Sequence, residues 1–452
     1  MAPLKTPKRS PLQPPSSHMT FLDRPRLLFQ RLSGSLAIFR GYLVVVFGTG
    51  FARTLSFITA VILARELGAF SFGEVSVFLA FLGFWVGNDF LDQTFVRYAN
   101  APQGERPEEY LRAVFVLKIA LNAILLVASF PVARFLATIV FDKPSLSTPI
   151  FAGLVCGVGL NFLSLRAATY QAEERFARYT TTSSSFYLLT FITVVPLALT
   201  SSPDQTERVY GAYAGVATLV GLYAFLALKR TVRELRFHKH LIRVIISFSR
   251  WLFADNVVYI FHQRLDIFLL TAFASLSAVG EYSAAVRVVQ IVSLLTGTLA
   301  PALLPRATRT GESPALLRAY LRHSAVLSGV IGVLVCAIWL PAPAIFEIFF
   351  GDEYRGAATV ARILLVGTAL IAVYVPLAQL LLAYNQPRRM FYLAALKLCI
   401  IAAVGVSLVP RFGSTGAALA VTLSDAAALI YVLLVLRQPI RRALALPSLV
   451  TH

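Results

Sequence analysis

Long uninterrupted runs of apolar residues dominate this chain of 452 residues and limit what it can fold into. About twelve windows approach the roughly 20 residues that a helix needs to cross a hydrocarbon core about 30 Å thick. Backbone exposed to lipid must satisfy its own hydrogen bonds, which leaves helices or a closed barrel, and runs this long favour helices. The predicted spans are residues 36–64, 74–96, 113–136, 149–172, 183–200, 209–228, 246–272, 278–304, 320–346, 357–384, 390–409 and 414–436.

The charges are few and unevenly distributed. Apolar residues make up 57% of the chain, charged residues 14%, and the mean hydropathy is +0.72, which excludes an ordinary soluble domain. Most Lys and Arg lie in alternate connectors, which predicts an even number of spans and cytoplasmic termini. The net charge of +19 therefore follows the topology and does not indicate a nucleic-acid partner. The opposite connectors hold only Arg65, Arg134, Lys143, Arg208, Arg355 and Arg411.

One short segment is echoed along the chain. Residues 67–76 read LGAFSFGEVS and residues 274–283 read ASLSAVGEYS, so that two Gly-Glu pairs lie 207 positions apart (280 minus 73). Each pair falls between two apolar runs, which indicates a duplicated half-chain with a connector between spans. We expect an all-α polytopic membrane protein, with about twelve transmembrane helices in two pseudosymmetric six-helix lobes around a central cavity.

The same pattern sets the expected domain boundaries. The N-terminal stretch is basic and rich in proline and lacks the features of a signal peptide, which favours a disordered tail. The expected units are a disordered basic cytoplasmic tail at 1–35, an N-terminal lobe at 36–228, a basic cytoplasmic linker at 229–245, a C-terminal lobe at 246–436 and a cytoplasmic tail at 437–452.

Several chemistries find no support in the sequence. No phosphate-binding loop of the Walker type occurs, and the glycine-rich run GTGFAR at 48–53 lies inside a predicted span, where helix packing explains it better. The outward connectors are too short to hold the active site of a membrane glycosyltransferase. Cys156, Cys336 and Cys399 lie inside apolar runs without the spacing of metal ligands. We therefore expect no enzyme, no catalytic residues, no metal and no cofactor.

Charged side chains inside the predicted spans are the most informative residues. Each costs about 2.5 to 3.5 kcal/mol at a helix centre if it faces lipid, so these groups are expected to face water or partners in a polar interior. The basic members are Arg53, Lys118, Arg264, Arg287 and Lys397, and the acidic members are Asp89, Asp92, Asp255, Asp266 and Asp425.

The predicted seventh span carries a polar stripe. At 100° per residue, Asp255, Tyr259, His262 and Asp266 fall on one face of a helix. Arg264 falls on the opposite side. Either this span is kinked or broken near Arg264, or the arginine is buried against a neighbouring helix.

Two further groups allow two interpretations each. Asp89 and Asp92 share a face of the second span, and Lys118 enters the third span at comparable depth. Lys397 and Asp425 lie on adjacent spans. Each group is either a structural ion pair that holds helices together or a site of proton or cation coupling.

The three arginines point to an anionic ligand. Arg53, Arg264 and Arg287 lie at broadly similar depth, and the 207-residue offset places Arg53 opposite Ile260, one helical turn from Arg264. A guanidinium group donates bidentate hydrogen bonds to phosphate and keeps its charge. These residues are therefore the candidates for binding phosphate and sugar, while the alternative is that each arginine pairs with a nearby aspartate.

Five segments together resemble a known family. They are ARELGAFSFGEVS at 64–76, RLDIFLLTAFASLSAVGEYSAA at 264–285, the Pro-containing run at 301–305, FGDEY at 350–354 and FGSTGAALA at 412–420. Across about residues 36–436 the chain resembles the oligosaccharide-lipid flippases and polysaccharide transporters that export O-antigen and exopolysaccharide. That family lies within the multidrug, oligosaccharidyl-lipid and polysaccharide exporter superfamily.

The resemblance implies a function as well as a fold. It implies twelve to fourteen helices and a cationic cavity that opens alternately to each side of a bacterial inner membrane. The implied substrate is an oligosaccharide on a polyprenyl pyrophosphate carrier, moved from the cytoplasmic to the outer leaflet. The implied partners are this lipid-linked oligosaccharide, membrane lipids, and a polysaccharide polymerase with its chain-length machinery. Arg264 belongs to a matched segment, whereas Arg53 and Arg287 are assigned by position.

Two other functions stay open, as does the energy source. A cation-coupled drug exporter of the same superfamily would favour an acidic cavity, and a membrane scaffold would need its arginines for stability alone. Membrane potential supplies about 2.3 kcal/mol per charge per 100 mV, so outward movement of a phosphate group needs no nucleotide. Proton or sodium antiport through Asp89, Asp92, Asp255 or Asp266 is the competing hypothesis.

Overall fold

The computed structural model describes residues 23–86, 90–100, 107–200, 205–233, 238–311, 313–384 and 386–445, and the regular elements in these ranges are helices. They are α1 (Asp23–Val86), α2 (Phe90–Ala99), α3 (Pro107–Phe135), η1 (Leu136–Val140), η2 (Pro144–Leu146), α4 (Ser147–Ala172), α5 (Phe176–Ala198), α6 (Gln205–Val232), α7 (Lys239–Phe273), α8 (Leu276–Thr308), η3 (Arg309–Gly311), α9 (Pro314–Trp339), α10 (Ala342–Phe349), η4 (Asp352–Tyr354), α11 (Arg355–Ala383) and α12 (Pro387–Ala445).

The number of spans follows once two bends are counted. By length and composition, nine of the described helices can cross a membrane, or ten when the bent pair His240–Arg250 and Leu252–Phe273 forms one span. The dihedral angles are not helical at Gly68 in α1 and at Gly413 in α12. The second arms of α1 and α12 bring the total to twelve, as the apolar runs predict.

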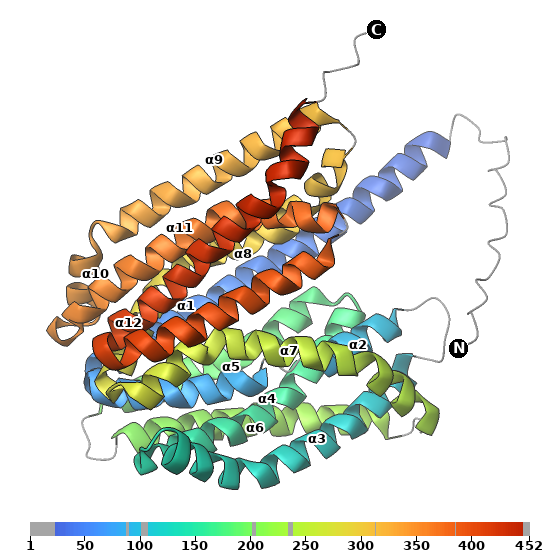
Figure 1. The fold of residues 1–452 in the computed structure, drawn as a ribbon. Coiled ribbons are helices and arrows are strands. Elements are labelled where there is room, and N and C mark those ends of the chain that lie inside the picture. The colour runs from blue at the N-terminus through green and yellow to red at the C-terminus, as the bar shows by residue number, and fades with distance from the viewer. Residues whose placement is uncertain are drawn as a thin grey trace, which may run out of the picture.

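The bend in α12 is a full reversal of the chain. Lys397 and Asp425 are 28 positions apart (425 minus 397), which is about 42 Å along a straight helix. Their side chains nevertheless meet, with 2.7 Å between Nζ and Oδ1. Figure 1 shows the two arms of α12 side by side, and it shows α1 turning back in the same way at the opposite end from its start. Positive φ angles of 73° at Gly68 and 53° at Gly413 explain why glycine occupies both bends.

The helices form two groups, with α7 between them. Helices α2 to α6 lie together in the lower part of Figure 1, α8 to α12 lie together above them, and the first arm of α1 extends beside the upper group toward the upper right. The start of α1 and the end of α12 lie at one end of the bundle, as an even number of spans requires. We call this the basic end, because most Lys and Arg lie in its connectors. The predicted tail extends to residue 35, whereas α1 already begins at Asp23, and residues 1–22 lie outside the described ranges.

The opposite end, here called the junction end, holds the two echoed segments, and one expectation about them was wrong. The Gly-Glu pairs are not in connectors but inside helices. The helical breaks come five residues earlier, at Gly68 and at Ser275, and these positions are again 207 apart (275 minus 68). A β-carbon at Gly73 would lie 1.9 Å from the carbonyl oxygen of Leu276, and one at Gly280 would lie 2.0 Å from that of Ala69. The duplicated glycines therefore form a close backbone contact between the two halves, because only glycine permits this approach.

Capping at the two breaks differs between the halves. The Ser275 side chain accepts a hydrogen bond from the backbone N–H of Ala278 and so caps α8 locally. The matching residue Gly68 has no side chain, and Glu353 of η4 instead accepts from the N–H of Ala69 at 2.9 Å. The next residue, Tyr354, donates its hydroxyl to the carbonyl oxygen of Ala64 at 2.9 Å. The run FGDEY at 350–354 thus completes the bend of α1 from the other half of the chain.

Lys143 ties the junction end together from a third side. It lies between η1 and η2 and donates through Nζ to the carbonyl oxygens of Thr271, at 2.5 Å, and Ala274, at 2.8 Å, where α7 ends. A cation at a helix C-terminus is favourable because the last carbonyl groups carry partial negative charge. Burial lowers the pKa of Lys143 from its usual value, while the neighbouring Asp142 opposes this shift.

Candidate functional site

Arg287 lies where both halves of the chain meet. It projects from α8, is half-buried, and lies within electrostatic range of Tyr213 on α6, Tyr187 on α5 and Arg264 on α7. Tyr187 and Tyr213 belong to the first half of the chain, whereas Arg264 and Arg287 belong to the second half. The sequence-predicted residues Arg264 and Arg287 therefore lie within electrostatic range of each other, and tyrosine hydroxyl groups from the first half lie within range of Arg287.

Arg264 fits against α1 because the facing residue there is glycine. A β-carbon at Gly83 would lie 2.4 Å from Nη2 of Arg264, so the missing side chain at position 83 makes room for the guanidinium group. Helix α7 continues without a break from Leu252 to Phe273, and its 41° bend lies between Arg250 and Leu252. Of the two alternatives for the seventh span, the structure favours the one in which Arg264 packs against a neighbouring helix, and its side chain is half-buried there.

Asp266 is held by a hydroxyl group from the next helix. Its Oδ2 accepts a hydrogen bond of 2.5 Å from the hydroxyl of Tyr282 on α8, and its Oδ1 accepts from the backbone N–H of Ile267 at 2.8 Å. Arg264 lies within electrostatic range of the same carboxylate. Both carboxylate oxygens thus have donors, and the negative charge of Asp266 offsets part of the charge of Arg264.

Three of the predicted site residues do not join this group among the described contacts. Arg53 is exposed on the first arm of α1, and no described contact links it to Arg264 or Arg287. The side chain of Asp255 and the whole of Asp89 lie outside the described residues. The place of Arg53 in the anion site, and the roles of Asp89 and Asp255 in ion coupling or structural pairing, stay predictions.

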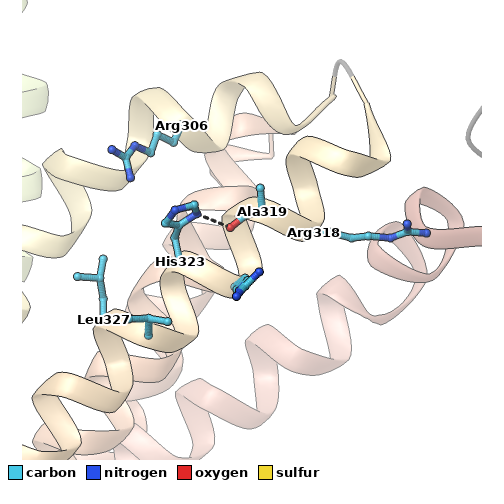
Figure 2. Close-up of a pocket in the computed structure, with 7 residues that line it drawn as sticks. Arg306, Arg318, Ala319, His323 and Leu327 are labelled. Atoms are coloured by element: carbon cyan, nitrogen blue, oxygen red, sulfur yellow. Dashed lines mark hydrogen bonds between the residues drawn. The ribbon is translucent and has the colours of Figure 1, made fainter. Parts of the chain in front are cut away.

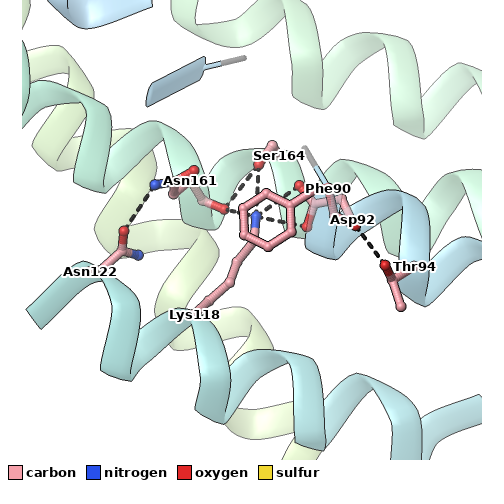
Figure 3. Close-up of polar contacts among 7 residues, drawn as sticks. All are labelled: Phe90, Asp92, Thr94, Lys118, Asn122, Asn161 and Ser164. Carbon is pink, nitrogen blue, oxygen red and sulfur yellow. Dashed lines mark hydrogen bonds and ion pairs between the residues drawn. The ribbon is translucent and has the colours of Figure 1, made fainter. Parts of the chain in front are cut away.

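Asp92 and Lys118 form a closed polar cluster near the basic end (Figure 3). Nζ of Lys118, on α3, lies 2.7 Å and 2.8 Å from the two carboxylate oxygens of Asp92 on α2. It also donates to the carbonyl oxygen of Asn161 at 2.7 Å and to the hydroxyl of Ser164 at 3.1 Å, both on α4. The amide of Asn161 in turn donates to Asn122 at 2.9 Å. One buried ammonium group thus connects three helices.

Lys397 and Asp425 form the second buried pair. They join the two arms of α12 at 2.7 Å, and Nζ of Lys397 also donates to the hydroxyl of Tyr374 on α11 at 3.0 Å. This hydroxyl is 3.4 Å from Oδ1 of Asp425. Lys397 lies within electrostatic range of His262, and Asp425 within range of Tyr282. The pair is therefore next to the group that contains Asp266 and Arg264.

Sequence reasoning missed the neutral polar partners in these clusters. A search for charged residues within apolar spans does not select neutral side chains. The partners missed for this reason are the tyrosines at 187, 213, 282 and 374 and the residues Asn161 and Ser164. A usable signal was present, since a buried tyrosine inside an apolar span places a hydroxyl group where it needs a partner.

The arrangement suits recognition of an anion. Two guanidinium groups close together repel each other unless a negative charge lies near them, and their donors match phosphate oxygens. Within the described residues, no group of three or more His, Cys, Asp or Glu side chains is placed to hold a metal ion.

Solved structures of two transporters share this fold. The chain matches "Lipid II flippase MurJ, inward closed conformation" with a TM-score of 0.71 at 11% identity, over 89% of this chain and 90% of that one. It matches "Inward-facing conformation of a multidrug resistance MATE family transporter of the MOP superfamily" with a TM-score of 0.69 at 14% identity, over 88% and 96%. At such low identity these matches show the fold, and they confirm the predicted all-helical polytopic architecture.

Comparison of sequences identifies the family. A curated relative from Haloferax volcanii, "Probable low-salt glycan biosynthesis flippase Agl15", is 23% identical over 399 residues, which cover 85% of this chain and 79% of that protein. The family model described as "Polysaccharide biosynthesis protein" matches residues 38–310, more than half of the chain. The chain therefore belongs to the polysaccharide biosynthesis protein family, a family of transporters and not of enzymes, as its motifs predict.

Proposed function

We propose that this protein flips a polyprenyl-pyrophosphate-linked oligosaccharide from the cytoplasmic to the outer leaflet of a bacterial inner membrane, for the synthesis of O-antigen or exopolysaccharide. Family membership and the glycan flippase among the relatives support the substrate class. The observation that carries the proposal is that Arg264 and Arg287 lie within electrostatic range of each other where helices of both halves meet.

The two arginines are assigned to the pyrophosphate. A pyrophosphate placed between them relieves the repulsion between their charges and accepts their planar donors. The hydroxyl groups of Tyr187 and Tyr213, beside Arg287, are suited to sugar hydroxyls. The polyprenyl chain stays in the bilayer, because its apolar surface gains nothing from a polar interior.

The decisive experiment neutralises the arginines in the native host. In Arg264→Gln and Arg287→Gln we expect the lipid-linked precursor to accumulate and surface polysaccharide to fall by roughly 10- to 100-fold, since one hydrogen bond to a charged group is worth about 1.5 to 3 kcal/mol. Arg287→Lys keeps the charge but loses the fork, so it should retain part of the activity. Protein levels in the membrane are measured alongside.

Arg208→Gln is the matched control, because Arg208 is exposed at the start of α6. It should leave precursor levels unchanged. Normal precursor levels in Arg264→Gln and Arg287→Gln, at normal protein levels, would refute this flippase mechanism. A loss of protein without precursor accumulation would favour the scaffold, and impaired export of a cationic drug with normal polysaccharide would favour the drug exporter.

Transport also requires the junction end to open. The halves touch there through the backbone at Gly73 and Gly280, so a substrate cannot leave at that end until they separate. Gly280→Ala forces a β-carbon against the Ala69 carbonyl and should weaken this contact by about 1 to 3 kcal/mol, as overpacking does in other protein cores. The measure is cross-linking across the junction end by cysteine pairs, which should decrease. Gly297→Ala on the same helix has no atom within 4 Å of its new β-carbon and should leave cross-linking unchanged.

A further inference from the structure

A separate groove lies at the basic end, between the last turns of α8 and the first turns of α9 (Figure 2). Its volume is about 630 Å³. Figure 2 shows Arg306 on α8 beside the ring of His323 on the neighbouring helix α9, with Arg318 extending away from both. The lining residues are Arg306, Arg318, Ala319, Arg322, His323, Val326 and Leu327.

The lining changes from basic to apolar along one face of α9. Arg322 and Val326 are four residues apart, as are His323 and Leu327, so each apolar residue lies one turn below a basic one. The apolar face continues at Val330, which is 54% exposed. From Pro314 to Trp339, α9 contains no acidic residue, and Glu312 in the preceding connector lies outside the described residues. A ligand that fits must therefore be negative at one end and apolar at the other.

The position of α9 indicates where such a ligand comes from. In its most apolar window only 17% of the residues are buried inside the protein, the lowest share among the nine candidate spans. Helix α9 therefore presents most of its surface to the surrounding bilayer. The groove lies beside the short connector between α8 and α9, and basic connectors of this kind are expected at the level of phospholipid head groups.

We propose that this groove binds an anionic membrane phospholipid, with its phosphate between Arg306 and Arg322 and one acyl chain along Val326 and Leu327. The phosphate accepts the guanidinium donors, and the acyl chain covers apolar side chains that the protein leaves exposed. His323 donates Nδ1–H to the carbonyl oxygen of Ala319 at 2.7 Å, which leaves Nε2 as the ring nitrogen that can contact the head group. The site is distinct from Arg264 and Arg287, and it does not depend on the transported substrate.

The experiment measures lipid binding by the full-length protein. Native mass spectrometry in detergent compares phosphatidylglycerol with phosphatidylcholine of the same acyl chains, for the wild type and for Arg306→Gln/Arg322→Gln. The wild type should prefer phosphatidylglycerol, and the double variant should bind it about 30-fold more weakly, since each basic side chain near an anionic head group contributes about 1 kcal/mol and 1.4 kcal/mol is tenfold. Val326→Asn/Leu327→Asn should weaken both lipids alike.

Arg230→Gln/Arg233→Gln is the matched control, because both arginines are exposed at the basic end of α6. It should keep phosphatidylglycerol binding within about twofold of the wild type. Equal binding of phosphatidylglycerol and phosphatidylcholine by the wild type would overturn the proposal. So would equal losses of phosphatidylglycerol binding in Arg306→Gln/Arg322→Gln and in Arg230→Gln/Arg233→Gln. Complete displacement by inorganic phosphate would identify a free phosphate site instead, and loss of a co-purified lipid-linked precursor would identify a substrate site. If Arg306→Gln/Arg322→Gln does not fold, the single variants Arg306→Gln and Arg322→Gln should each bind phosphatidylglycerol about fivefold more weakly than the wild type.

Discussion

Among the described residues, each half of the molecule buries one Lys–Asp pair, and the two pairs are built differently. Nζ of Lys118 has three separate acceptors, in Asp92, Asn161 and Ser164, for its three N–H groups, and its side chain is 2% exposed. Nζ of Lys397 has two described acceptors, in Asp425 and Tyr374, and its side chain is 14% exposed. Each N–H of the first ammonium group has an acceptor, whereas the second ammonium group has one described acceptor fewer.

Their surroundings differ in the same sense. The first pair connects α2, α3 and α4, which belong to one half of the chain. The second pair lies beside His262 and Tyr282, and Tyr282 donates to Asp266 next to Arg264. We infer that the first pair holds helices together, and that the second responds to what binds at the arginines.

The largest expected effect comes from breaking the first pair. Lys118→Met leaves Asp92 buried without its cation, which typically costs about 3 to 5 kcal/mol. We expect a clear fall in the melting temperature of the purified protein and in its amount in the membrane.

Removing both charges is the control for this change. Asp92→Asn/Lys118→Met should recover most of the lost stability, because no isolated charge remains. Transport per folded molecule should then be close to normal. A stable double variant that no longer transports would show that this pair also takes part in coupling.

The sequence alone could identify these charges but not what surrounds them. Hydropathy located Lys118, Lys397 and their aspartates inside the membrane, because charge in an apolar run is conspicuous. It could not separate a structural pair from a coupling pair. That distinction depends on Asn161, Ser164 and Tyr374, which are neutral and become visible only when helices distant in sequence are packed together.

A smaller loss of stability, but a larger loss of function, is expected from the second pair. Lys397→Met leaves the buried Asp425 with the hydroxyl of Tyr374 as its remaining described donor, so we expect a loss of about 3 kcal/mol, the lower end of the cost of breaking a buried ion pair. Precursor should nevertheless accumulate in the native host at normal protein levels. If Lys397→Met and Asp92→Asn/Lys118→Met transport equally well, the functional difference between the pairs is wrong.

The fold shows a similar division between what was predictable and what was not. The apolar runs located the spans, and the 207-residue echo located the duplication. The echo predicts a connector because Gly-Glu is polar and small, whereas in the structure its glycines allow α1 and α8 to touch. The run FGDEY was recognised only as a motif. Its role at the bend of α1 needs a contact between residues 284 positions apart, from Ala69 to Glu353, which no local pattern reveals.

The smallest expected effect tests a single hydroxyl group in each pair. Tyr374→Phe removes one hydrogen bond to Lys397, and Ser164→Ala removes one to Lys118, so each should cost about 0.5 to 1.5 kcal/mol. With matched stabilities, transport becomes the informative measurement. If the second pair exchanges partners during transport, Tyr374→Phe should slow precursor turnover severalfold while Ser164→Ala leaves it unchanged. Equal precursor turnover in Tyr374→Phe and Ser164→Ala would mean that the third N–H group of Lys397 has no part in transport. The loss of the Tyr374 hydroxyl would then matter no more than the loss of the Ser164 hydroxyl beside Lys118, whose three N–H groups all have acceptors.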